Sequence, residues 1–529
     1  MVVILLAITL PYLFAWWRTP DGGWFTGALL NPDDLGVYIS AMRQGASGDW
    51  LYNFVYSPEP WQPRLMLSLY LVLGKITSLF TAPNALWFHL WRVLLAFATL
   101  IALAFWVRTL LSNRPRWQWT AWILILFGGG ISWLIAFVLP SATNLMPDIG
   151  MAEWSPLIAL FYSPHFALGL GLEVIVFTCV LGMCEVTSAR EGIRWAVFGA
   201  IAALLAVLVY VYSLVIITLV IGLYMALWAL KLRRIPWRQW FLSSIIILPL
   251  VPLFYYYAFW TNNDPFWETY TRSSHIIYPP PPLGALIGLG ALLLLAIAGI
   301  SWWLRMGRSL LLPVWAIVHL LIIYVPFIPY SGRFALGLMV PIATLAAVGL
   351  EATVLPALIR SRTYPRFTSL TPTPFATLRR ICLLLLVPST VIAILLFFKG
   401  PVINKDFPYY LPEADVQAAT WLGENSDPSA LTFAYYPLGN FLPRVYQGKV
   451  FIGQLDFTHE LGNKLLLFEQ FWDPEMSASD RSEFLKQWGV THVFSGTYEA
   501  PFQAEPVSLP WQAVYDRDGI TIFEVDSTR

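Results

Sequence analysis

Long apolar runs separated by short polar loops constrain the fold of this chain more than any other feature. A transmembrane helix needs about 20 apolar residues to cross about 30 Å of hydrocarbon. A bilayer also requires each spanning segment to satisfy its own backbone hydrogen bonds, so the runs are predicted to be helices. Eleven such runs lie at residues 1–17, 84–107, 118–139, 165–186, 194–209, 213–230, 238–260, 283–304, 310–328, 334–355 and 381–398.

Two of the apolar stretches need interpretation. The run from Ile193 to Leu230 is too long for one crossing, and aromatic and hydroxyl side chains at 210–213 interrupt its aliphatic pattern, so we divide it there. The segment 65–80 is nearly long enough to span, and we interpret it as a helix that lies at the membrane surface or dips in and returns. The predicted fold class is therefore an α-helical polytopic membrane protein with about 11–13 transmembrane helices.

Composition supports a membrane protein and argues against two other classes. Hydrophobic residues make up 58% and charged residues 12% of the chain, against roughly 45–50% and 25% in soluble domains. The net charge of +1 argues against a dedicated nucleic-acid binder, which needs a strongly basic face. The three cysteines lie in apolar runs without the spacing of a zinc or redox site. Residues 1–17 lack a basic n-region and a cleavage site, which predicts a retained anchor rather than a removed signal.

Lysine and arginine residues alternate between loops in a way that predicts orientation. If residues 65–80 do not span, one set of loops collects Arg108, Arg114, Arg116, Arg190, Arg194, Lys231, Arg233, Arg234, Arg238, Arg305, Arg308, Arg360, Arg362, Arg366, Arg379 and Arg380. The positive-inside rule makes this side and the N-terminus cytoplasmic. The loops 18–83, 140–164 and 261–282 and the chain after residue 398 are then extracytoplasmic. We therefore predict a multi-pass protein of the inner (plasma) membrane.

After Phe398 the composition changes to that of a soluble α/β domain, so we divide the chain into residues 1–398 and 399–529. Pro412 is suited to begin a helix. The predicted helices span 412–423, 460–472 and 479–488, and the predicted strands span 431–436, 450–454 and 491–497. The terminal stretch AVYDRDGITIFEV predicts a hairpin, with an Asp-Gly turn between alternating apolar positions.

Two adjacent aspartates, Asp33 and Asp34, begin a predicted amphipathic helix in the first outward loop. One explanation is structural: Asn31 caps the helix, Pro32 takes its first position, and both carboxylates complement the helix dipole. The other explanation is functional. Successive helical residues point roughly 100° apart, so only one aspartate can share a face with Tyr38. Asp34, four residues before Tyr38, is that residue.

The motif PDDLGVYISAMRQGASGDWL, followed by LYNFVYSPEP and LSLYLVLGKI, resembles the first extracytoplasmic loop of GT-C membrane glycosyltransferases. The likeness is greatest to bacterial proteins related to aminoarabinose and protein O-mannosyl transferases, and it lies mainly in residues 31–92, the outward loops and the C-terminal domain. In that superfamily an acidic residue of the first loop is catalytic, and the donor is a polyprenyl-phosphate or dolichyl-phosphate sugar. The resemblance implies that Asp34, with Asp33 as the alternative, is the essential carboxylate.

Sugar transfer from a lipid phosphate needs a base and cations. A carboxylate takes the proton of the acceptor hydroxyl, and fixed cations stabilise the departing phosphate. The candidate cations on the outer side are Arg64, Arg92 and Arg333. His89 lies one helical turn before Arg92 and is predicted to face the same pocket, although Arg92 alternatively snorkels or pairs structurally. Arg333 and Phe334 resemble an arginine-phenylalanine pair of related bacterial proteins, and an interfacial anchor is the alternative role of Arg333.

Two later outward loops supply further candidates. The resemblance implies a second acid, for which either Asp148 or Glu153 fits, and His165 follows them. Solvated loop charges are the alternative role. The stretch NNDPFWETYTRSSHIIYPPPP places aromatic residues beside Asp264 and His275. Aromatic faces beside polar groups suit sugars, and they also suit the membrane interface.

The sequence therefore predicts a membrane glycosyltransferase that moves a sugar from a polyprenyl-phosphate donor to an extracytoplasmic glycan, lipid or protein. Asp34 is the predicted base, and Tyr38 is predicted to contact the substrate. No cofactor is assigned; some members of the superfamily use a divalent cation, but adjacent Asp33 and Asp34 lack the usual i, i+2 spacing. The alternatives are a transporter or flippase of lipid-linked glycans and a non-catalytic scaffold. The chain shows neither the internal repeat nor the paired halves typical of transporters.

Overall fold

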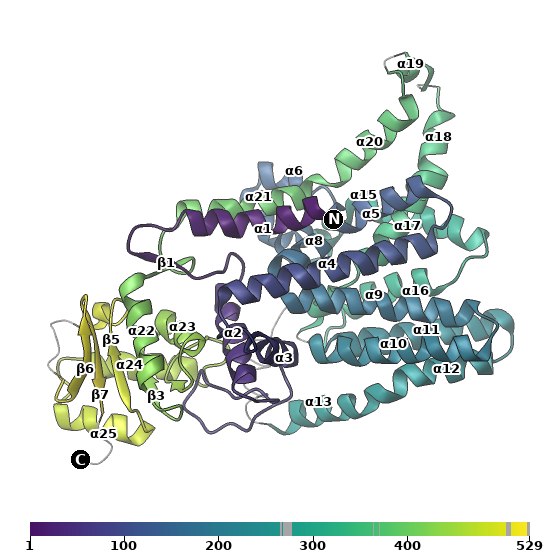
Figure 1. The fold of residues 1–529 in the computed structure, drawn as a ribbon. Coiled ribbons are helices and arrows are strands. Elements are labelled where there is room, and N and C mark those ends of the chain that lie inside the picture. Colours follow the sequence, from purple (N-terminus) through teal and green to yellow (C-terminus); the bar gives the residue numbers. More distant parts are fainter. Residues whose placement is uncertain are drawn as a thin grey trace. The chain divides into compact units, whose positions relative to one another are not determined.

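The computed structural model describes residues 1–264, 267, 278–328, 330–362, 364–369, 371–503 and 509–525. The chain divides into two compact units (Figure 1). Unit 1 comprises Met1–Thr9, Arg92–Trp260 and Ile276–Leu396, and unit 2 comprises Leu10–Trp91, Thr261–His275 and Phe397–Arg529. The first outward loop thus belongs to the same unit as the C-terminal chain, and the domain division at residue 398 stays a prediction.

The protein is a mostly helical multi-pass membrane protein. Among the described residues, eight helical segments are long and apolar enough to cross a membrane. Five of them are single helices: α4 (Ala85–Leu110), α9 (Pro164–Glu185), α10 (Ala189–Val209), α11 (Ser213–Leu232) and α15 (Pro282–Arg305). The segment Pro115–Val138 consists of α5 (Pro115–Phe127) and α6 (Ser132–Val138), and the segment Trp237–Trp260 consists of α12 (Trp237–Ile247), η2 (Leu248–Leu250) and most of α13 (Val251–Asn263). The segment Ser331–Ile359 consists of η3 (Ser331–Ala335), α17 (Met339–Gly349), η4 (Leu350–Val354) and α18 (Leu355–Ile359).

Three further runs are helical but bent or short. Helices α20 (Pro374–Leu386) and α21 (Pro388–Ile403) meet at 48° and form one more span if they cross together. Helices α1 (Val2–Trp17) and α16 (Leu311–Ile322) are apolar but shorter. Every one of the predicted apolar runs therefore contains a helix. The predicted break near residue 210 is confirmed, because α10 ends at Val209 and α11 begins at Ser213.

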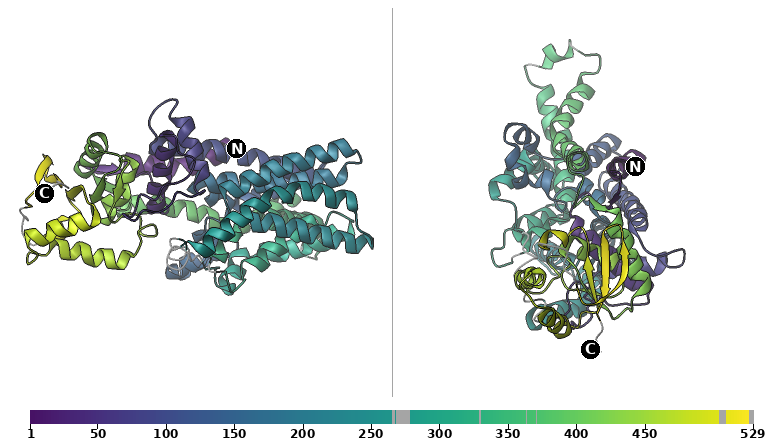
Figure 2. Two further views of the ribbon diagram at one scale, coloured as in Figure 1. Left: turned by 90° about the horizontal axis from the view of Figure 1, so that it is seen from below. Right: turned by 90° about the vertical axis from the view of Figure 1, so that its left-hand side faces the viewer.

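Small residues let the apolar helices of unit 1 pack closely. A Cβ atom on Gly299 of α15 would lie 1.9 Å from the carbonyl oxygen of Leu345, and one on Gly349 would lie 1.9 Å from that of Leu295. Only glycine permits this approach of α15 and α17, a common device where helices meet within a membrane. Helices α9, α10 and α11 likewise run side by side, as Figures 1 and 2 show.

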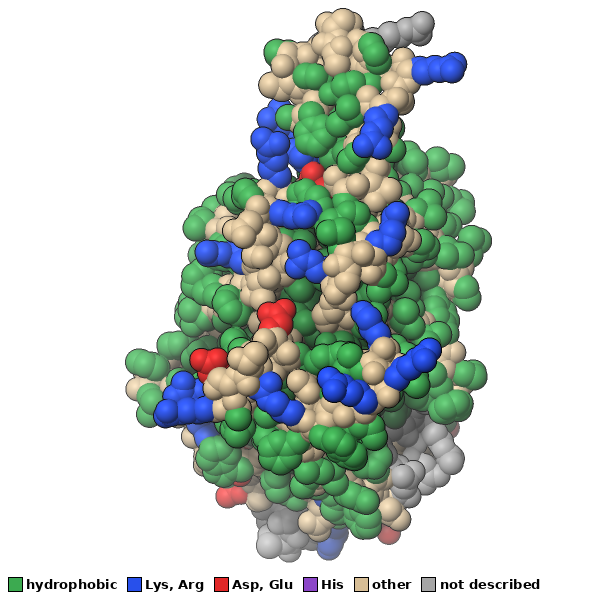
Figure 3. Space-filling model, turned by 90° about the vertical axis from the view of Figure 1, so that its right-hand side faces the viewer, with side chains coloured by type: hydrophobic (Ala, Val, Ile, Leu, Met, Phe, Trp, Pro, Cys, Tyr) green, Lys and Arg blue, Asp and Glu red, His purple; other side chains and the backbone are tan. Residues whose placement is uncertain are grey.

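Cationic side chains lie on one face of unit 1 (Figure 3). Arg108 is near the end of α4, Lys231 is near the end of α11, and Arg305 ends α15. The opposite ends of the neighbouring helices, such as the end of α10 and the start of α11, carry tyrosines instead. The alternation of charge predicted from the sequence thus corresponds to two ends of one helical unit.

In unit 2, helix α2 (Pro32–Ala46) packs against α3 (Ser68–Thr77). A ten-residue helix rises only about 15 Å, half of a hydrocarbon core of about 30 Å, so α3 alone is too short to span. Pro32 begins α2 as predicted, but the expected cap is wrong. Asn31 has a left-handed conformation, with φ 44°, and its side chain makes no capping hydrogen bond.

Unit 2 also contains two β-sheets. Strand β1 (Gly23–Phe25) pairs antiparallel with β2 (Tyr410–Pro412) and joins the first loop to the C-terminal chain. The second sheet has the order β4-β3-β5-β7-β6. Strands β4, β3 and β5 are parallel, β7 pairs antiparallel with β5, and β6 pairs antiparallel with β7. Its C-terminal strands are the yellow arrows of Figure 2. Its elements are β3 (Leu431–Phe433), β4 (Lys449–Val450), β5 (His492–Ser495), β6 (Gln512–Arg517), β7 (Ile520–Glu524), α22 (Glu413–Asn425), α23 (Tyr436–Phe441), α24 (Leu461–Trp472) and α25 (Ala478–Trp488).

The C-terminal sheet and its helices agree with the sequence pattern. The predicted hairpin is confirmed: Asp518 and Gly519 connect β6 and β7 with φ of 52° and 78°, the conformation that an Asp-Gly turn favours. Phe433 on β3 packs against Phe468 and Phe471 of α24, with ring centroids 4.8 and 4.6 Å apart. Strands β1 and β2 and helix α23 escaped prediction because each is only a few residues long.

A buried carboxyl group follows β5 in this domain. Glu499 is fully buried and accepts hydrogen bonds from the backbone N–H groups of Tyr435, at 2.7 Å, and Gly496, at 3.0 Å. Burial, assisted by the nearby Asp415 and opposed by these two hydrogen bonds, raises the pKa of Glu499 to about 8. The native state therefore holds a proton on Glu499 at neutral pH that the unfolded chain, with a pKa of about 4.3, releases.

This difference predicts a pH-dependent stability. Below about pH 4 both states are protonated, whereas between about pH 5 and 8 only the native state keeps the proton, so its stability falls as pH rises. We expect Glu499→Gln to remove this part of the decline in the thermal midpoint of the full chain between pH 5 and pH 8. Glu483→Gln, on the exposed face of α25, is the matched control. An identical pH slope in wild type and Glu499→Gln would contradict the assignment.

Candidate functional site

The loop-1 helix α2 places Asp34 and Tyr38 on one face, as their spacing predicted. The Tyr38 hydroxyl donates to Asp34 Oδ2 at 3.4 Å. The Tyr38 ring stacks on Tyr70 of α3, with centroids 4.4 Å apart and planes at 11°, and lies parallel to Phe88 of α4 at 6.0 Å. Because two aromatic rings fix Tyr38, its hydroxyl is held beside the partly exposed Asp34 carboxylate.

The neighbouring Asp33 has different partners. The Tyr436 hydroxyl donates to Asp33 Oδ1, and Asn440 Nδ2 lies 3.4 Å from the same oxygen. Both partners belong to α23 of the C-terminal chain. Burial raises the pKa of Asp33 and the negative Asp34 adds to this rise, whereas the Tyr436 hydrogen bond lowers the pKa. The two aspartates are thus distinguished: Asp33 is held by α23, and Asp34 faces Tyr38.

Arg64 and Asp264, two candidates 200 residues apart, form a buried ion pair in unit 2. Arg64 Nε donates to Asp264 Oδ2 at 2.8 Å, and Arg64 Nη2 donates to the same oxygen. The backbone of Arg64 also pairs with that of Tyr52, at 2.8 and 3.0 Å. A buried ion pair that is broken is costly, so the pair holds the chain after α13 against the first loop. The candidate His275 lies outside the described residues.

His89 and Arg92, which were expected to face one pocket, contact different backbone carbonyls. His89 Nε2 lies 2.8 Å from the carbonyl oxygen of Gly27, and because a carbonyl can only accept, this nitrogen carries the proton. Arg92 is fully buried, and its Nη1 donates to the carbonyl oxygen of Ile8 on α1 at 3.0 Å. The hydrogen bond from Arg92 to a backbone carbonyl agrees with the alternative that Arg92 has a structural role. That His89 and Arg92 face a shared pocket stays a prediction.

Arg333 and Glu153 are brought together in unit 1. Arg333 lies in η3, and its Nη1 donates to Glu153 Oε1 at 2.8 Å. The carboxylate is 6% and the guanidinium 19% exposed, so the pair is partly shielded from water. An arginine has five N–H donors in a planar fork, so one guanidinium can hold Glu153 and still bind a phosphate oxygen.

Aromatic residues from the break between α10 and α11 surround this turn. The Tyr210 hydroxyl donates to the Arg333 carbonyl oxygen at 2.7 Å. Tyr212 packs on Tyr330 and on Phe334, with centroids 5.6 and 5.8 Å away. The candidate His165 adjoins the same group, because its Nδ1 lies 3.0 Å from the Ser163 hydroxyl and its ring lies 6.3 Å from that of Tyr210. No functional role was predicted for Tyr210 and Tyr212, whose only signal in the sequence is that they interrupt an apolar run.

Asp148, the alternative second acid, has structural partners. It lies in α7 (Pro147–Gly150) and is 5% exposed. It accepts from the Ser132 hydroxyl at 2.5 Å and from the Gly130 N–H at 3.1 Å. Burial raises the pKa of Asp148, and these hydrogen bonds, with one from Ser389, lower it. Asp148 thus satisfies the backbone where Gly128–Gly130 interrupt the helices α5 and α6, whereas Glu153 contacts the candidate cation Arg333.

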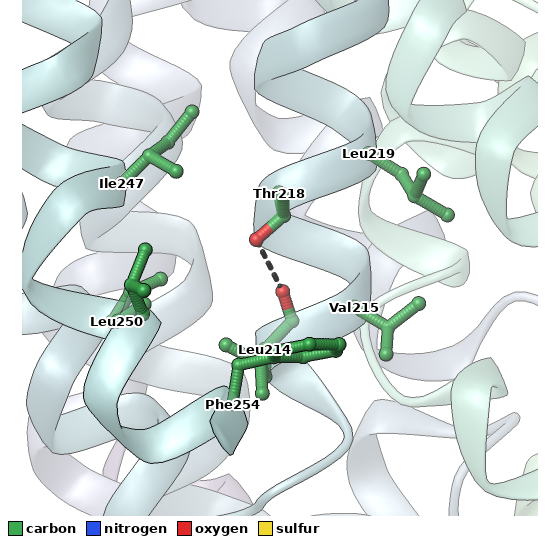
Figure 4. A pocket seen from close by; sticks show the side chains of 8 residues that line it. Leu214, Val215, Thr218, Leu219, Ile247, Leu250 and Phe254 are labelled. Carbon is green, nitrogen blue, oxygen red and sulfur yellow. Dashed lines mark hydrogen bonds between the residues drawn. The ribbon is translucent and has the colours of Figure 1, made fainter. Parts of the chain in front are cut away.

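An apolar groove lies between α11 and the α12–α13 segment (Figure 4). It encloses about 360 Å³ and is lined by Leu214, Val215, Thr218, Leu219, Ile247, Leu250, Val251 and Phe254. The one hydroxyl among these lining residues, that of Thr218, donates to the Leu214 carbonyl oxygen at 2.7 Å. The groove therefore offers a hydrocarbon surface, and it begins two residues after Tyr212.

Metal-ligating side chains do not gather in the described part of the chain. Across those residues, no group of three or more histidine, cysteine, aspartate or glutamate side chains is placed to hold an ion.

Comparisons with known proteins identify the fold. No family model and no curated protein matches the sequence. Among solved structures, the archaeal oligosaccharyltransferase AglB from Archaeoglobus fulgidus, in complex with an inhibitory peptide and a dolichol-phosphate, is 15% identical with a TM-score of 0.51, over 93% of this chain and 69% of AglB. ArnT from Cupriavidus metallidurans is 15% identical with a TM-score of 0.51 when bound to undecaprenyl phosphate, over 100% of this chain and 98% of ArnT. The apo structure of the same ArnT is 16% identical with a TM-score of 0.52, over 99% of this chain and 98% of ArnT.

Both similar proteins are GT-C membrane glycosyltransferases. The chain has the GT-C fold. The resemblance seen in the first loop is thus confirmed at the level of the fold, which extends over almost the whole chain. At such low identity the comparisons do not assign a role to any side chain of this chain, and the site residues stay predictions.

Close contact between α2 and α23 predicts the effect of a single methyl group. A Cβ on Gly36 would lie 2.5 Å from Asn440 Oδ1 and 2.6 Å from the Asn440 carbonyl oxygen. Alanine in a helix normally stabilises by up to about 1 kcal/mol over glycine, but we expect Gly36→Ala to lower the thermal midpoint because α23 must move. Gly462→Ala in α24, where nothing lies within 4 Å, is the control and should be neutral or stabilising. Equal midpoints for both variants would contradict the contact.

Proposed function

We propose that this protein is a membrane glycosyltransferase that transfers a sugar from a polyprenyl-phosphate donor to an extracytoplasmic acceptor. The observation that carries the proposal is the GT-C fold across almost the whole chain, with Asp34 at the start of the first-loop helix. AglB and ArnT were solved with dolichol-phosphate and undecaprenyl phosphate, which supports a polyprenyl-phosphate donor. The acceptor class is a glycan, a lipid or a protein.

Asp34 is the proposed base. A sugar or protein hydroxyl becomes a competent nucleophile when a carboxylate takes its proton, and the deprotonated oxygen then attacks the anomeric carbon. Asp33 is the weaker candidate, because Tyr436 and Asn440 already occupy one of its oxygens. Tyr38 donates to Asp34 and orients the carboxylate toward the acceptor.

Arg333 is the proposed cation for the donor phosphate. When the sugar leaves, negative charge develops on the lipid phosphate, and a fixed guanidinium stabilises it. Glu153 holds one N–H of this guanidinium and so sets its direction. The groove that begins near Tyr212 supplies apolar surface of the kind that isoprene units require, and we propose that it takes the donor tail.

The distribution of charge supports the orientation. The cationic end of unit 1 (Figure 3) is cytoplasmic by the positive-inside rule. Arg333, Glu153 and His165 lie at the opposite helix ends and are then extracytoplasmic. We propose an inner-membrane location, with the N-terminus in the cytoplasm and the C-terminal domain outside.

Replacing the base tests the reaction. We expect cells that lack the protein to accumulate a lipid-phosphate sugar and to lose one envelope glycan, as measured by mass spectrometry of lipid carriers and glycans. Wild type should restore the glycan, and Asp34→Asn should reduce its formation by roughly 10²–10⁴-fold, the usual contribution of a general base. Asp33→Asn should retain more activity.

Asp21→Asn, an exposed acid of the same loop, is the matched control and should behave as wild type. An unchanged glycan product with Asp34→Asn would refute the proposed base. If the Asp34→Asn cells also kept normal lipid carriers, the result would favour a transporter or a scaffold over a transferase.

A further inference from the structure

A polar network lies inside the helical part of unit 1, beneath the turn that carries Arg333. Glu173 on α9 and His319 on α16 are 1% and 0% exposed. The indole N–H of Trp315 donates to Glu173 Oε1 at 3.0 Å and to His319 Nε2 at 2.9 Å, and Glu173 Oε1 lies 3.2 Å from His319 Nε2. Ionisable groups within a membrane are costly and mark functional sites, yet the proposed reaction does not use these groups directly.

The hydrogen bonds fix how the protons are arranged. His319 Nδ1 lies 2.6 Å from the carbonyl oxygen of Phe334, and a carbonyl can only accept, so Nδ1 carries a proton. Nε2 faces a carboxyl group, and one further proton avoids two acceptors in contact. Either Glu173 carries it and donates to Nε2, or Nε2 carries it and donates to Glu173, in which case the Trp315 N–H donates to Glu173 alone. In both arrangements Glu173 holds the imidazole in the orientation that donates to Phe334.

The same turn is also held at the adjacent carbonyl. Tyr210 donates to the Arg333 carbonyl oxygen, and His319 donates to the next one, that of Phe334. Gly337 then turns the chain with φ of 95°, and a Cβ there would lie 2.5 Å from Glu173 Oε1. Non-helical backbone at membrane depth requires donors from neighbouring groups, and these side chains supply them at two successive residues.

We propose that Glu173 and His319 are positioning residues that set the Arg333 guanidinium for the donor phosphate. The inference rests on the proposed function in one respect, that Arg333 receives the phosphate. The buried pair acts through the backbone carbonyl of Phe334, the residue after Arg333, and together with Tyr210 at the Arg333 carbonyl it fixes where the Arg333 side chain starts. Glu153 fixes where its guanidinium ends. Both ends of one long, flexible side chain are therefore held.

The test measures binding of undecaprenyl phosphate to the full chain in lipid nanodiscs. Arg333→Ala should weaken binding by roughly tenfold or more, the size of one charge-assisted contact. Glu173→Ala should weaken it by a similar factor, and adding it to Arg333→Ala should cause no further loss, because both changes act through one contact. Thr178→Val, a buried change on the same helix whose hydroxyl bonds its own helix, is the control and should change binding less than about twofold.

A second variant separates positioning from folding. Replacing both Glu173 and His319 by apolar residues of similar size, as Glu173→Leu with His319→Phe, leaves no buried charge unpaired. This variant should remain folded, with a thermal midpoint lowered only by the loss of hydrogen bonds to the Phe334 carbonyl and the Trp315 N–H. We expect this folded double variant to bind undecaprenyl phosphate as weakly as Glu173→Ala. Glu173→Gln, which donates a hydrogen bond to His319 Nε2, should restore binding.

The outcomes distinguish the two proposals. If Arg333→Ala weakens binding and the apolar double variant does not, the positioning role is overturned and the proposed function stands. Additive losses for Glu173→Ala and Arg333→Ala would overturn it as well, because the sites would then act independently. If the protein binds undecaprenyl phosphate and Arg333→Ala has no effect, the phosphate role of Arg333 in the proposed function fails.

Discussion

The inability of hydrocarbon to hydrogen-bond the peptide backbone is the constraint on which the rest of this structure depends. It makes each crossing a helix and allows a break only where other groups satisfy the freed N–H and C=O groups. Each break near the candidate site follows this rule. At Gly128–Gly130 the carboxylate of Asp148 accepts from a backbone N–H, and at η3 the hydroxyl of Tyr210 and the imidazole of His319 donate to successive carbonyls. In unit 1, polar side chains therefore gather where helices are interrupted.

Unit 2 is held together by contacts between distant segments of the chain. The pairing of β1 with β2 connects the first loop to residues after the last apolar run. Tyr436 and Asn440 then reach Asp33, some 400 residues earlier. This arrangement has a chemical consequence for two adjacent carboxylates. One is fixed by the C-terminal chain and has its pKa raised by burial and by its neighbour, and the other faces Tyr38, so identical side chains have different partners.

Features set by local periodicity were predictable, and features set by long-range contacts were not. The apolar runs, the break near residue 210, the Asp-Gly hairpin and the shared face of Asp34 and Tyr38 all depend on residues only a few positions apart. The pairing of Arg64 with Asp264 and the bond from Tyr436 to Asp33 join segments about 200 and 400 residues apart, and no spacing rule encodes them. The cap expected at Asn31 is wrong because the left-handed backbone there leaves its side chain unable to bond the helix start.

In the proposed function, the ion pair of Arg333 and Glu153 has two opposing effects on the binding of a phosphate by Arg333. A carboxylate beside the cation weakens its attraction for a phosphate, since Coulomb terms of opposite sign add. Before the donor enters, however, the partly buried guanidinium would be costly without a partner. Glu153 removes that cost and holds the planar fork in one direction through a single N–H. In the proposed function, the guanidinium stays paired with Glu153 when the lipid phosphate leaves and is not left as an isolated charge. In the proposed function the weaker attraction therefore favours release of the lipid phosphate after transfer, while the fixed direction keeps the next donor aligned.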